Sequence, residues 1–442
     1  MATRLTSLDA CRGFVIVAMT FVNYLGGMPN VPHLLEHEAG GVDGFTLADL
    51  VFPSFLLLVG LSIPLAYDRR VQEQAAAPDG ALRRGLLHIT GRTLSLLLLG
   101  VAGVESGAYS AVGTGLQAHW WWLAFYLCLY LVWRRWSPSS RQRYGRLPDY
   151  LRWAGMAGMT ALLVICRLDY GDGTGLVPIR TSWWGILGMI GWSFLPNALV
   201  WYLLARRWSA RGRVSSLQAP LLAVFVGQVL LYTLWHAGKL GFLANEWLGI
   251  AELFGSHAAL VMAGVIAGQV ALEVQEGRRR LALWAGWALV LYGLGSLLRP
   301  WQVANKMDGT ASWTLLTGAV ALAGFWVCYA VIDLPPPAHG GWRRFLALPR
   351  WSATALLAPI GVNAMLAYFL PDVCRQVMNA SAVSLCRDWG WGAEQGPLNL
   401  WNVFWPIGGQ GGTMGLLNAA LLAAFIAALT WFASRRGWVL KL

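Results

Sequence analysis

Long apolar segments recur along this chain of 442 residues, with short polar loops between them. Each segment is close to the ~20 residues that a helix needs to cross the hydrocarbon core of a bilayer. Only 12% of the residues are charged, whereas a soluble domain carries roughly 25%. The apolar positions do not alternate as in barrel strands, so helices remain the way to satisfy the backbone in lipid. We therefore predict an all-α, polytopic integral membrane protein with about twelve transmembrane helices, in a range of ten to twelve. The expected spans are residues 11–27, 48–66, 86–105, 119–133, 151–168, 183–204, 217–235, 257–272, 281–298, 313–332, 352–371 and 414–433.

The distribution of Lys and Arg predicts the orientation of these spans. With the N-terminus in the cytoplasm, the segments on that side hold 24 Lys and Arg residues and the opposite loops hold six. Cytoplasmic loops of membrane proteins carry this excess of positive charge. We expect both termini in the cytoplasm and the loop that contains His37 on the periplasmic side of a bacterial inner membrane. The first residues do not have the order of a cleavable signal peptide.

We expect one transmembrane domain over residues 1–442, since no internal repeat and no folded extramembrane segment is evident. The proline-rich segment 334–350 reads as a cytoplasmic linker, and 372–413 as the longest loop on the other side. That loop contains Cys374 and Cys386, which leaves a disulfide open in an oxidising compartment.

The net charge of +12 comes from basic residues in the short loops between spans. We assign this charge to membrane topology and expect no nucleic-acid partner. The sequence has no P-loop, no dinucleotide fingerprint and no GxSxG elbow. No pair of cysteines has the spacing of zinc ligands, so we expect no metal.

The stretch from Asn23 to Gly60 holds the main candidate catalytic groups. Asp49 lies at or just inside the apolar boundary, where a carboxylate is costly unless it lines a cavity or has a partner. Pro53 lacks the N–H that would bond the carbonyl of Asp49, so an acceptor is left free beside the carboxylate. A helix cap is the alternative role of Asp49, because Asp is common at helix starts. The other titratable residues of this loop are His33, Glu36, His37, Glu38 and Asp43.

Two of the first three spans carry polar residues on one helical face. Arg12 follows Asp9 by three residues, which favours a local ion pair. His88 and Arg92 share a face of the third expected span, with Arg92 several residues deep. A buried arginine is expensive unless it faces a polar cavity or an anion. Snorkelling of Arg92 to the cytoplasmic surface is the alternative.

Three further candidates lie later in the chain. His257 begins the span at 257–272, where a lone histidine commonly has a structural role. Trp313 opens the span at 313–332, after a polar stretch that includes Asn305 and Lys306. Asn363 is expected to be buried behind Pro359 and Gly361, either bridging helices by hydrogen bonds or lining a site.

Several motifs resemble the heparan-alpha-glucosaminide N-acetyltransferase family, in particular its bacterial NagX-type relatives among transmembrane acyltransferases. The most specific part lies within residues 1–66: RLTSLDACRG, then VNYLGG, a histidine, and GFTLADLVFPSFLLLVG. Further similar pieces are WWGILGMIGW at 183–192, GSHAALVMAGVIAG at 255–268, the stretch from Asn305 to Trp313, and PIGVNAMLAY at 359–368. The resemblance implies that an acetyl group passes from cytosolic acetyl-CoA to an amino sugar across the membrane.

The resemblance also implies roles for residues near the N-terminus. The family's loop histidine falls on His37, its aspartate on Asp49 and its asparagine on Asn23. The Trp of the family's usual loop pattern is absent here, and His37 lies two residues further from Asp49 than in that pattern. His33 is therefore a competing candidate for the histidine role.

Acyl transfer needs a base or nucleophile, for which histidine is the natural side chain, and a carboxylate can orient it. We expect His37 and Asp49 to be catalytic. Several phosphates of CoA require cationic partners. We expect the acetyl-CoA site to include Arg12, His88 and Arg92, and the acceptor site to include Asn23, His257, Trp313 and Asn363.

A secondary transporter of an amino sugar or muropeptide is the alternative function. It should show inverted repeats and paired broken helices, which the sequence does not reveal. The identity of the acceptor, N- against O-acylation, an acyl-histidine intermediate against direct transfer, and association into a homodimer all remain open.

Overall fold

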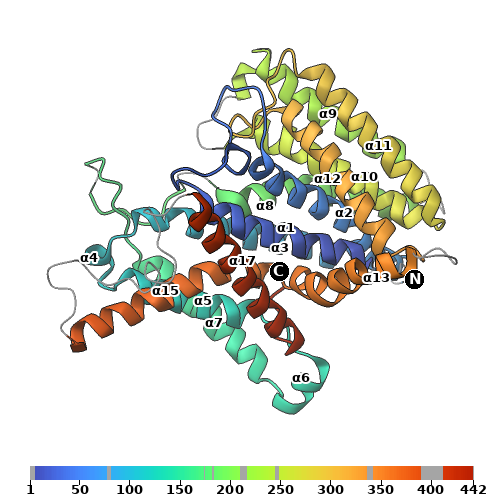
Figure 1. Ribbon diagram of the computed structural model, residues 1–442. Helices are drawn as coiled ribbons and strands as arrows, with labels where there is room; N and C mark the ends of the chain where they lie inside the picture. The colour runs from blue at the N-terminus through green and yellow to red at the C-terminus, as the bar shows by residue number, and fades with distance from the viewer. Residues whose placement is uncertain are drawn as a thin grey trace. The chain divides into compact units, whose positions relative to one another are not determined.

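The computed structural model describes residues 5–76, 81–173, 175–181, 184–209, 217–243, 248–335, 342–389 and 412–441. These residues form helices and the turns that join them, with isolated β-bridges in place of strands (Figure 1). The all-α prediction is confirmed. The α-helices are α1 (Thr6–Leu25), α2 (Leu47–Ala76), α3 (Ala81–Glu105), α4 (Ala111–Thr114), α5 (Ala118–Trp133), α6 (Pro138–Tyr144), α7 (Leu147–Ile165), α8 (Gly185–Ser209), α9 (Gln218–His236), α10 (His257–Glu273), α11 (Gly277–Leu298), α12 (Ala311–Ile332), α13 (Trp342–Ser352), α14 (Ala358–Val362), α15 (Ala364–Trp389) and α17 (Gly412–Arg435).

Every one of the twelve expected spans coincides with a helix, but fewer than twelve helices have the length and apolarity of a span. Among the described residues nine helices qualify, or ten if one bent pair is a single span. The two expected spans that do not qualify are consecutive, 119–133 and 151–168, and correspond to α5 and α7. Helix α5 has only 16 residues, and the first turns of α7 carry Asp149 and Arg152. The polytopic membrane class is therefore confirmed, and counting the bent pair as one span brings the described residues to ten candidates, the lower end of the predicted range.

The span expected at 352–371 is a broken helix. Residues Ala347–Val362 and Ala364–Ser381 meet at a bend of 75°. A π-helical turn at Ala353–Leu357 comes just before the break, and Pro359 follows it. Proline cannot donate a helical hydrogen bond and crowds the preceding turn, which accounts for a break here.

Two loop predictions are wrong in part. The expected outer loop 372–413 begins within α15, which continues to Trp389. Cys374 is a free thiol. Because Cys374 and Cys386 lie twelve residues apart on this helix, about 18 Å along its axis, they cannot form a disulfide. The expected linker 334–350 is partly the helix α13, whose sequence includes the good helix formers Arg, Leu and Ala.

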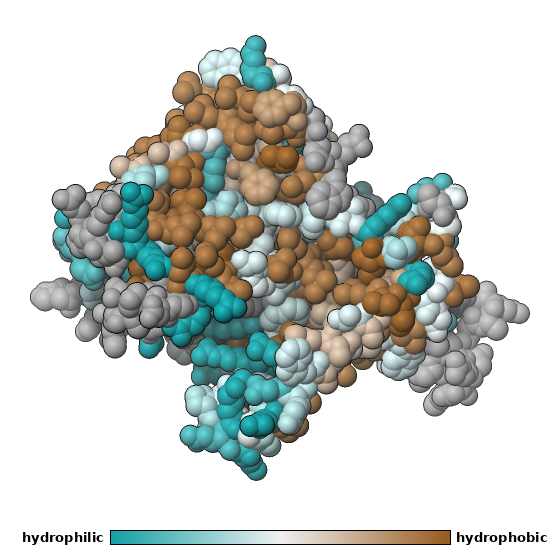
Figure 2. Space-filling view, turned by 180° about the vertical axis from the view of Figure 1, so that it is seen from behind, coloured by the Kyte–Doolittle hydropathy of each residue, from teal (hydrophilic) through white to brown (hydrophobic). Residues whose placement is uncertain are grey.

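The chain divides into two compact units. Unit 1 consists of Met1–Val15, Glu36–Gly103 and Ser182–Ala358, and unit 2 of Ile16–Leu35, Val104–Thr181 and Pro359–Leu442. The space-filling view shows apolar side chains over wide areas of the surface, as expected where lipid is the solvent (Figure 2).

Unit 1 is built on the packing of α2 against α10, which run beside each other in Figure 1. A Cβ at Gly60 would collide with the carbonyl oxygen of Val261, and a Cβ at Gly264 with that of Leu57. Small residues at such contacts let two helix backbones approach closely, which is a main source of helix association in lipid. This close contact fixes α2, whose first turn carries Asp49.

In unit 2 a buried asparagine holds the C-terminal segment. The amide of Asn363 donates to the carbonyl of Trp438 over 2.8 Å and accepts from the N–H of Leu440 over 3.0 Å. Asn363 is fully buried at the bend before α15. Its side chain thus links a helix break to the chain end that follows α17.

Candidate functional site

The candidate site begins with the local structure at the start of α2. The backbone N–H of Thr46 donates to Oδ2 of Asp49 over 3.1 Å, and the Thr46 hydroxyl lies 3.3 Å from the same oxygen. A Thr followed three residues later by an acidic residue is a capping-box arrangement. The capping role of Asp49 is therefore present, although it uses only one of the two carboxylate oxygens.

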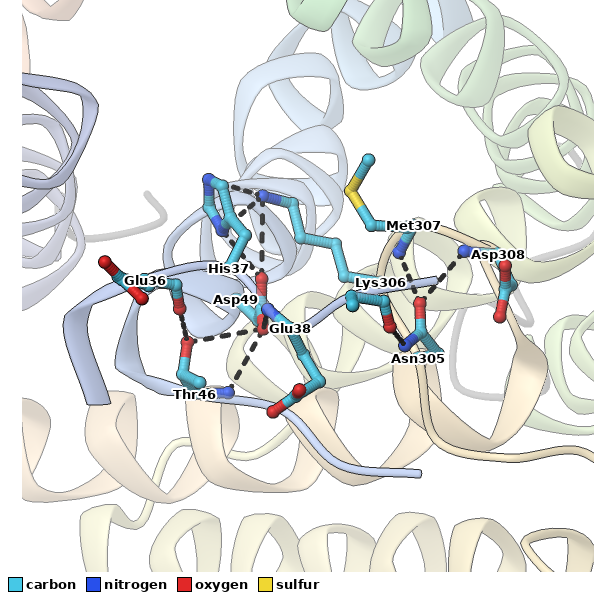
Figure 3. Close-up of polar contacts among 10 residues, drawn as sticks. Glu36, His37, Glu38, Thr46, Asp49, Asn305, Lys306, Met307 and Asp308 are labelled. Carbon is cyan, nitrogen blue, oxygen red and sulfur yellow. Dashed lines mark hydrogen bonds and ion pairs between the residues drawn. The ribbon is translucent and has the colours of Figure 1, made fainter. Parts of the chain in front are cut away.

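The second oxygen of Asp49 faces His37. Oδ1 lies 2.8 Å from Nδ1 of His37, while Oδ2 also accepts the N–H of Glu38 over 3.1 Å. The Asp49 side chain is fully buried, whereas that of His37 is 39% exposed. A buried carboxylate is tolerable when such donors surround it. The arrangement leaves a half-exposed imidazole anchored by a buried acid (Figure 3).

A lysine from a distant part of the chain completes this cluster. Nζ of Lys306 lies 3.0 Å from each ring nitrogen of His37 and 3.7 Å from Oδ1 of Asp49. Burial lowers the pKa of Lys306, although the carboxylate of Asp49 opposes this shift. Figure 3 shows the Lys306 ammonium beside the imidazole of His37. An ammonium can only donate, so Nδ1–H of His37 faces Asp49 and the lone pair of Nε2 faces Lys306.

Sequence reasoning did not assign Lys306 to the site and counted it only as one of the charges opposite the cytoplasm. The available signal was its place between Asn305 and Trp313, a stretch already noted for its resemblance to the family. What the sequence did not provide was the approach of two loops 269 residues apart.

Asn305 joins those loops. Its side-chain N–H groups donate to the carbonyls of Ala39 over 2.6 Å and Val42 over 2.8 Å. Its side-chain oxygen accepts the N–H groups of Met307 over 2.8 Å and Asp308 over 3.2 Å. The Asn305 side chain is fully buried and bonded through both its amide nitrogen and its oxygen. It therefore positions Lys306, the next residue, against His37.

Further contacts join the loop before α2 to the loop before α12. The guanidinium Nε of Arg299 lies 2.9 Å from both oxygens of Asp43, and the N–H of Ala304 donates to Asp43 over 2.9 Å. These bonds, that from Arg299 first, lower the pKa of Asp43. The N–H of Gly41 also donates to Asp308 over 2.8 Å. Thus the loop before α2 and the loop before α12 form one layer around the cluster.

Two of the residues predicted for the acceptor site lie together in unit 1. The ring of His257 is 6.1 Å from that of Trp313 and 5.6 Å from that of Phe52, edge to face. Phe52 follows Asp49 by three residues on α2, so this aromatic group lies about one turn from the carboxylate. The indole N–H of Trp313 is buried, and the structure shows no partner for it in the described part of the chain. Nδ1 of His257 is bonded to the carbonyl of Glu252 over 2.8 Å.

The three residues predicted to bind acetyl-CoA lie on α1 and α3, beside the later turns of α2. Arg12 contacts the Ser62 hydroxyl and lies 3.5 Å from Asp9. The hydroxyl of Tyr67 is 3.1 Å from Nδ1 of His88.

The guanidinium of Arg92 lies beside Tyr67 and 4.9 Å from the centre of the Phe194 ring. Tyr67 follows Asp49 by 18 residues, which is about 27 Å along a helix. The two groups of polar residues therefore lie near opposite ends of the span formed by α2. Their roles in binding CoA remain predictions.

The remaining candidates belong to unit 2. Asn23 is exposed near the end of α1, and His33 is exposed in the 3₁₀ turn His33–Leu35. Asn363 bridges segments by hydrogen bonds, as one of its two predicted roles requires. The histidine bonded to Asp49 is His37. Roles in substrate binding for Asn23 and Asn363 stay predictions.

The fold and the site define a class: a polytopic all-α membrane protein with a half-exposed histidine held between a buried carboxylate and a lysine. Residues 4–105 match the family model described as heparan-alpha-glucosaminide N-acetyltransferase, catalytic. The resemblance predicted from the sequence is confirmed over this part, which includes His37 and Asp49. The bacterial NagX-type relation stays a prediction.

Two curated relatives carry the same description. The chain is 37% identical over 101 residues to heparan-alpha-glucosaminide N-acetyltransferase of Mus musculus. It is 43% identical over 63 residues to the protein of that description from Homo sapiens. These alignments cover 23% and 14% of this chain, and 14% and 9% of the relatives. The chain therefore matches only a small part of the length of either relative.

Proposed function

We propose that this protein is a membrane-embedded acetyltransferase that moves the acetyl group of cytosolic acetyl-CoA to an amino sugar at the opposite face of the membrane. The observation that carries the proposal is the contact of His37 with Asp49 over 2.8 Å, within the region that matches the family model. A half-exposed imidazole whose Nδ1 is held by a buried carboxylate, and whose Nε2 carries a lone pair that Lys306 now faces, has the form of a general base once the ammonium moves to the substrate.

In the proposed reaction, Nε2 of His37 takes a proton from the acceptor amine or hydroxyl as that group attacks the thioester carbonyl. The bond from the acceptor to the carbonyl carbon forms and the C–S bond breaks. The CoA thiolate then recovers the proton from His37. Asp49 stabilises the imidazolium that exists between these steps. Attack by His37 itself, with an acyl-histidine as intermediate, uses the same residues in two steps.

Lys306 has a role in the same proposal. A thioester carbonyl gains negative charge at its oxygen as it becomes tetrahedral, and a cation placed beforehand stabilises that charge. The ammonium of Lys306 lies 3.0 Å from the imidazole, close to where the carbonyl would sit. His257 and Trp313 would then bind the sugar, since the buried indole N–H of Trp313 can donate a hydrogen bond to a sugar oxygen.

We propose that CoA approaches from the other end of α2, where Arg12, His88 and Arg92 lie. Nε of Arg92 is buried without a described partner, and its surroundings are the rings of Tyr67 and Phe194. A phosphate would supply the anion that a guanidinium in such a place requires.

The test is incubation of the purified protein with acetyl-CoA labelled in the acetyl group, with and without glucosamine. The expected product is labelled N-acetylglucosamine, formed in step with the release of CoA. Mannitol, which has hydroxyls but no amine, separates N- from O-acylation. Uptake of glucosamine into vesicles without any consumption of acetyl-CoA would favour the transporter instead.

A further inference from the structure

A basic pocket of about 210 Å³ lies in unit 2, at the end of the hairpin formed by α5 and α7. The pocket is independent of the candidate active site, and none of the predicted site residues lines it. Half of its ten lining residues are cationic and none is acidic. The cationic residues are Arg134, Arg135, Arg141, Arg152 and Lys441.

The C-terminal segment forms one wall of this pocket. The N–H of Arg135 donates to the carbonyl of Val439 over 2.8 Å, and the N–H of Lys441 donates to that of Trp133 over 3.0 Å. These bonds tie the chain end to the loop after α5. Lys441 is thereby held at the pocket although it is the penultimate residue of the chain.

The guanidinium of Arg134 has surroundings that suit the binding of an anion. Its guanidinium stacks 4.0 Å from the centre of the Trp136 ring, and the structure shows no partner for its buried Nε among the described residues. The neighbouring acid Asp149 lies 3.4 Å from Arg141 instead, in a pair that is half exposed. A stacked guanidinium keeps its fork of donors free for a phosphate.

The surroundings of the pocket are those of a membrane interface. Trp153 is 69% exposed, Tyr150 63% and Leu127 60%, all on the two helices of the hairpin. Exposed Trp and Tyr concentrate at the level of lipid headgroups. Figure 2 shows hydrophilic side chains gathered at the bottom of the view, the height at which α6 lies in Figure 1. Apolar helix surface thus borders a basic pocket.

We propose that this pocket binds the phosphate headgroup of an anionic phospholipid, whose acyl chains lie along the exposed apolar surface of α5 and α7. Phosphate is the shared chemistry of a lipid headgroup and of soluble phosphate compounds. The lipid is favoured because its acyl chains can cover the exposed side chains of Leu127, Tyr150 and Trp153, whereas a soluble phosphate has no apolar part to contact them. The five cationic residues of the pocket select an anionic headgroup over a zwitterionic one.

The test is native mass spectrometry of the purified, delipidated full chain titrated with phosphatidylglycerol. Phosphatidylcholine of the same chain length is the lipid control, and glycerol 3-phosphate and CoA are the soluble phosphate arms. The variant Arg134→Gln with Arg135→Gln removes two charges from the pocket. The matched control, Arg143→Gln with Arg146→Gln, removes two charges from the same connection between α5 and α7, at residues that do not line the pocket.

We expect one phosphatidylglycerol to bind the wild type and the control variant equally, and phosphatidylcholine to bind far more weakly. The pocket variant should lose roughly 30-fold in affinity, since each surface cation contributes about fivefold. If that variant is unstable, Arg135→Gln with Arg141→Gln, both exposed, gives the same comparison. Equal losses in the pocket and control variants would overturn the proposal. So would displacement of the lipid by CoA or glycerol 3-phosphate with the same dependence on Arg134.

Discussion

The carboxylate of Asp49 lies 2.8 Å from the imidazole of His37, twelve residues earlier in the chain. One oxygen of that carboxylate caps α2 and the other holds the histidine. A single buried acid therefore connects the start of a transmembrane helix to the group proposed to carry the chemistry.

The first prediction separates the two histidines of this loop. His37→Ala should lower turnover by ~10²–10⁴-fold, because loss of an acid–base group typically costs that much. CoA should still bind. His33→Ala, which also removes an exposed loop histidine, should have a mild effect. An inactive His33→Ala protein beside an active His37→Ala protein would exchange their proposed roles, and normal turnover in the double variant would exclude both.

The second prediction concerns Lys306. Its pKa is lowered by burial, so folding disfavours its protonated form. That cost is fully present below the folded-state pKa and declines as the pH rises toward the pKa of the unfolded chain. Lys306→Met should therefore keep or raise the melting temperature at pH 7, with a smaller difference from wild type at alkaline pH. Turnover should fall, because the cation beside His37 is lost.

Lys306→Arg is the matched control for charge. It should retain part of the activity lost in Lys306→Met. A drop in melting temperature for Lys306→Met, together with unchanged turnover, would give Lys306 a structural role in place of the catalytic one.

The third prediction concerns the contact between loops. Asn305→Ala leaves the carbonyls of Ala39 and Val42 and the N–H groups of Met307 and Asp308 without their partner. We expect a loss of roughly 2–4 kcal/mol in the free energy of unfolding, and a loss of turnover because Lys306 is displaced.

Asn305→Asp tests whether the donated hydrogen bonds of the amide are what holds the two loops together. A carboxylate would face the two carbonyl oxygens that the amide now bonds, so we expect damage at least as large. The exposed pair of Arg299 with Asp43 provides the comparison: Arg299→Gln should cost only about 0–1 kcal/mol. Thermal unfolding in one detergent measures all three variants, and a wild-type melting temperature for Asn305→Ala would contradict the prediction.

The fourth prediction tests the packing of α2 on α10. At Gly264 a Cβ would meet the backbone of Leu57, so Gly264→Ala should cost about 1–3 kcal/mol or more. Gly286 on α11 has nothing within 4 Å of such a Cβ. Gly286→Ala should be neutral or slightly stabilising, because alanine is the better helix former. Equal melting temperatures for the two variants would mean that the backbones do not meet as described.

The fifth prediction concerns topology. Bonds from Asn305 to Ala39 and Val42 place the loop before α2 on the same side of the membrane as the loop before α12. An even number of spans must then separate them. Helices α2, α3, α8, α9, α10 and α11 are candidates, so α5 and α7 either both span or both do not.

Cysteine labelling decides between these two cases. With both helices spanning, cysteine at Ser139 in α6 should react from the cytoplasm, and cysteine at Val42 from the opposite side. Reaction of both from one side would mean that α5 and α7 do not span. Reaction of Val42→Cys from the cytoplasm alone would reverse the orientation and remove the cross-membrane mechanism.

The sequence by itself determined the features that depend on residues close together in the chain, namely the helical segments and the carboxylate at an apolar boundary. Runs of about twenty apolar residues specify helices in lipid regardless of their neighbours, so all twelve segments were found. Asp49 was recognisable because a carboxylate at an apolar boundary is costly wherever it lies. The bend at Asn363 also has a local cause, because Pro359 and a π-helical turn weaken that helix, although the sequence did not show which span would break.

Only the tertiary structure decided which polar groups meet. Lys306 reaches His37 because Asn305 bonds the backbone of a loop some 260 residues away, and that bond exists only once α2 and the helices around it have packed. Asn363 could equally have lined a site, but the C-terminal segment folds back onto it. Hydropathy and capping depend on residues adjacent in the chain, whereas a catalytic cluster depends on distances that the packed helices alone impose.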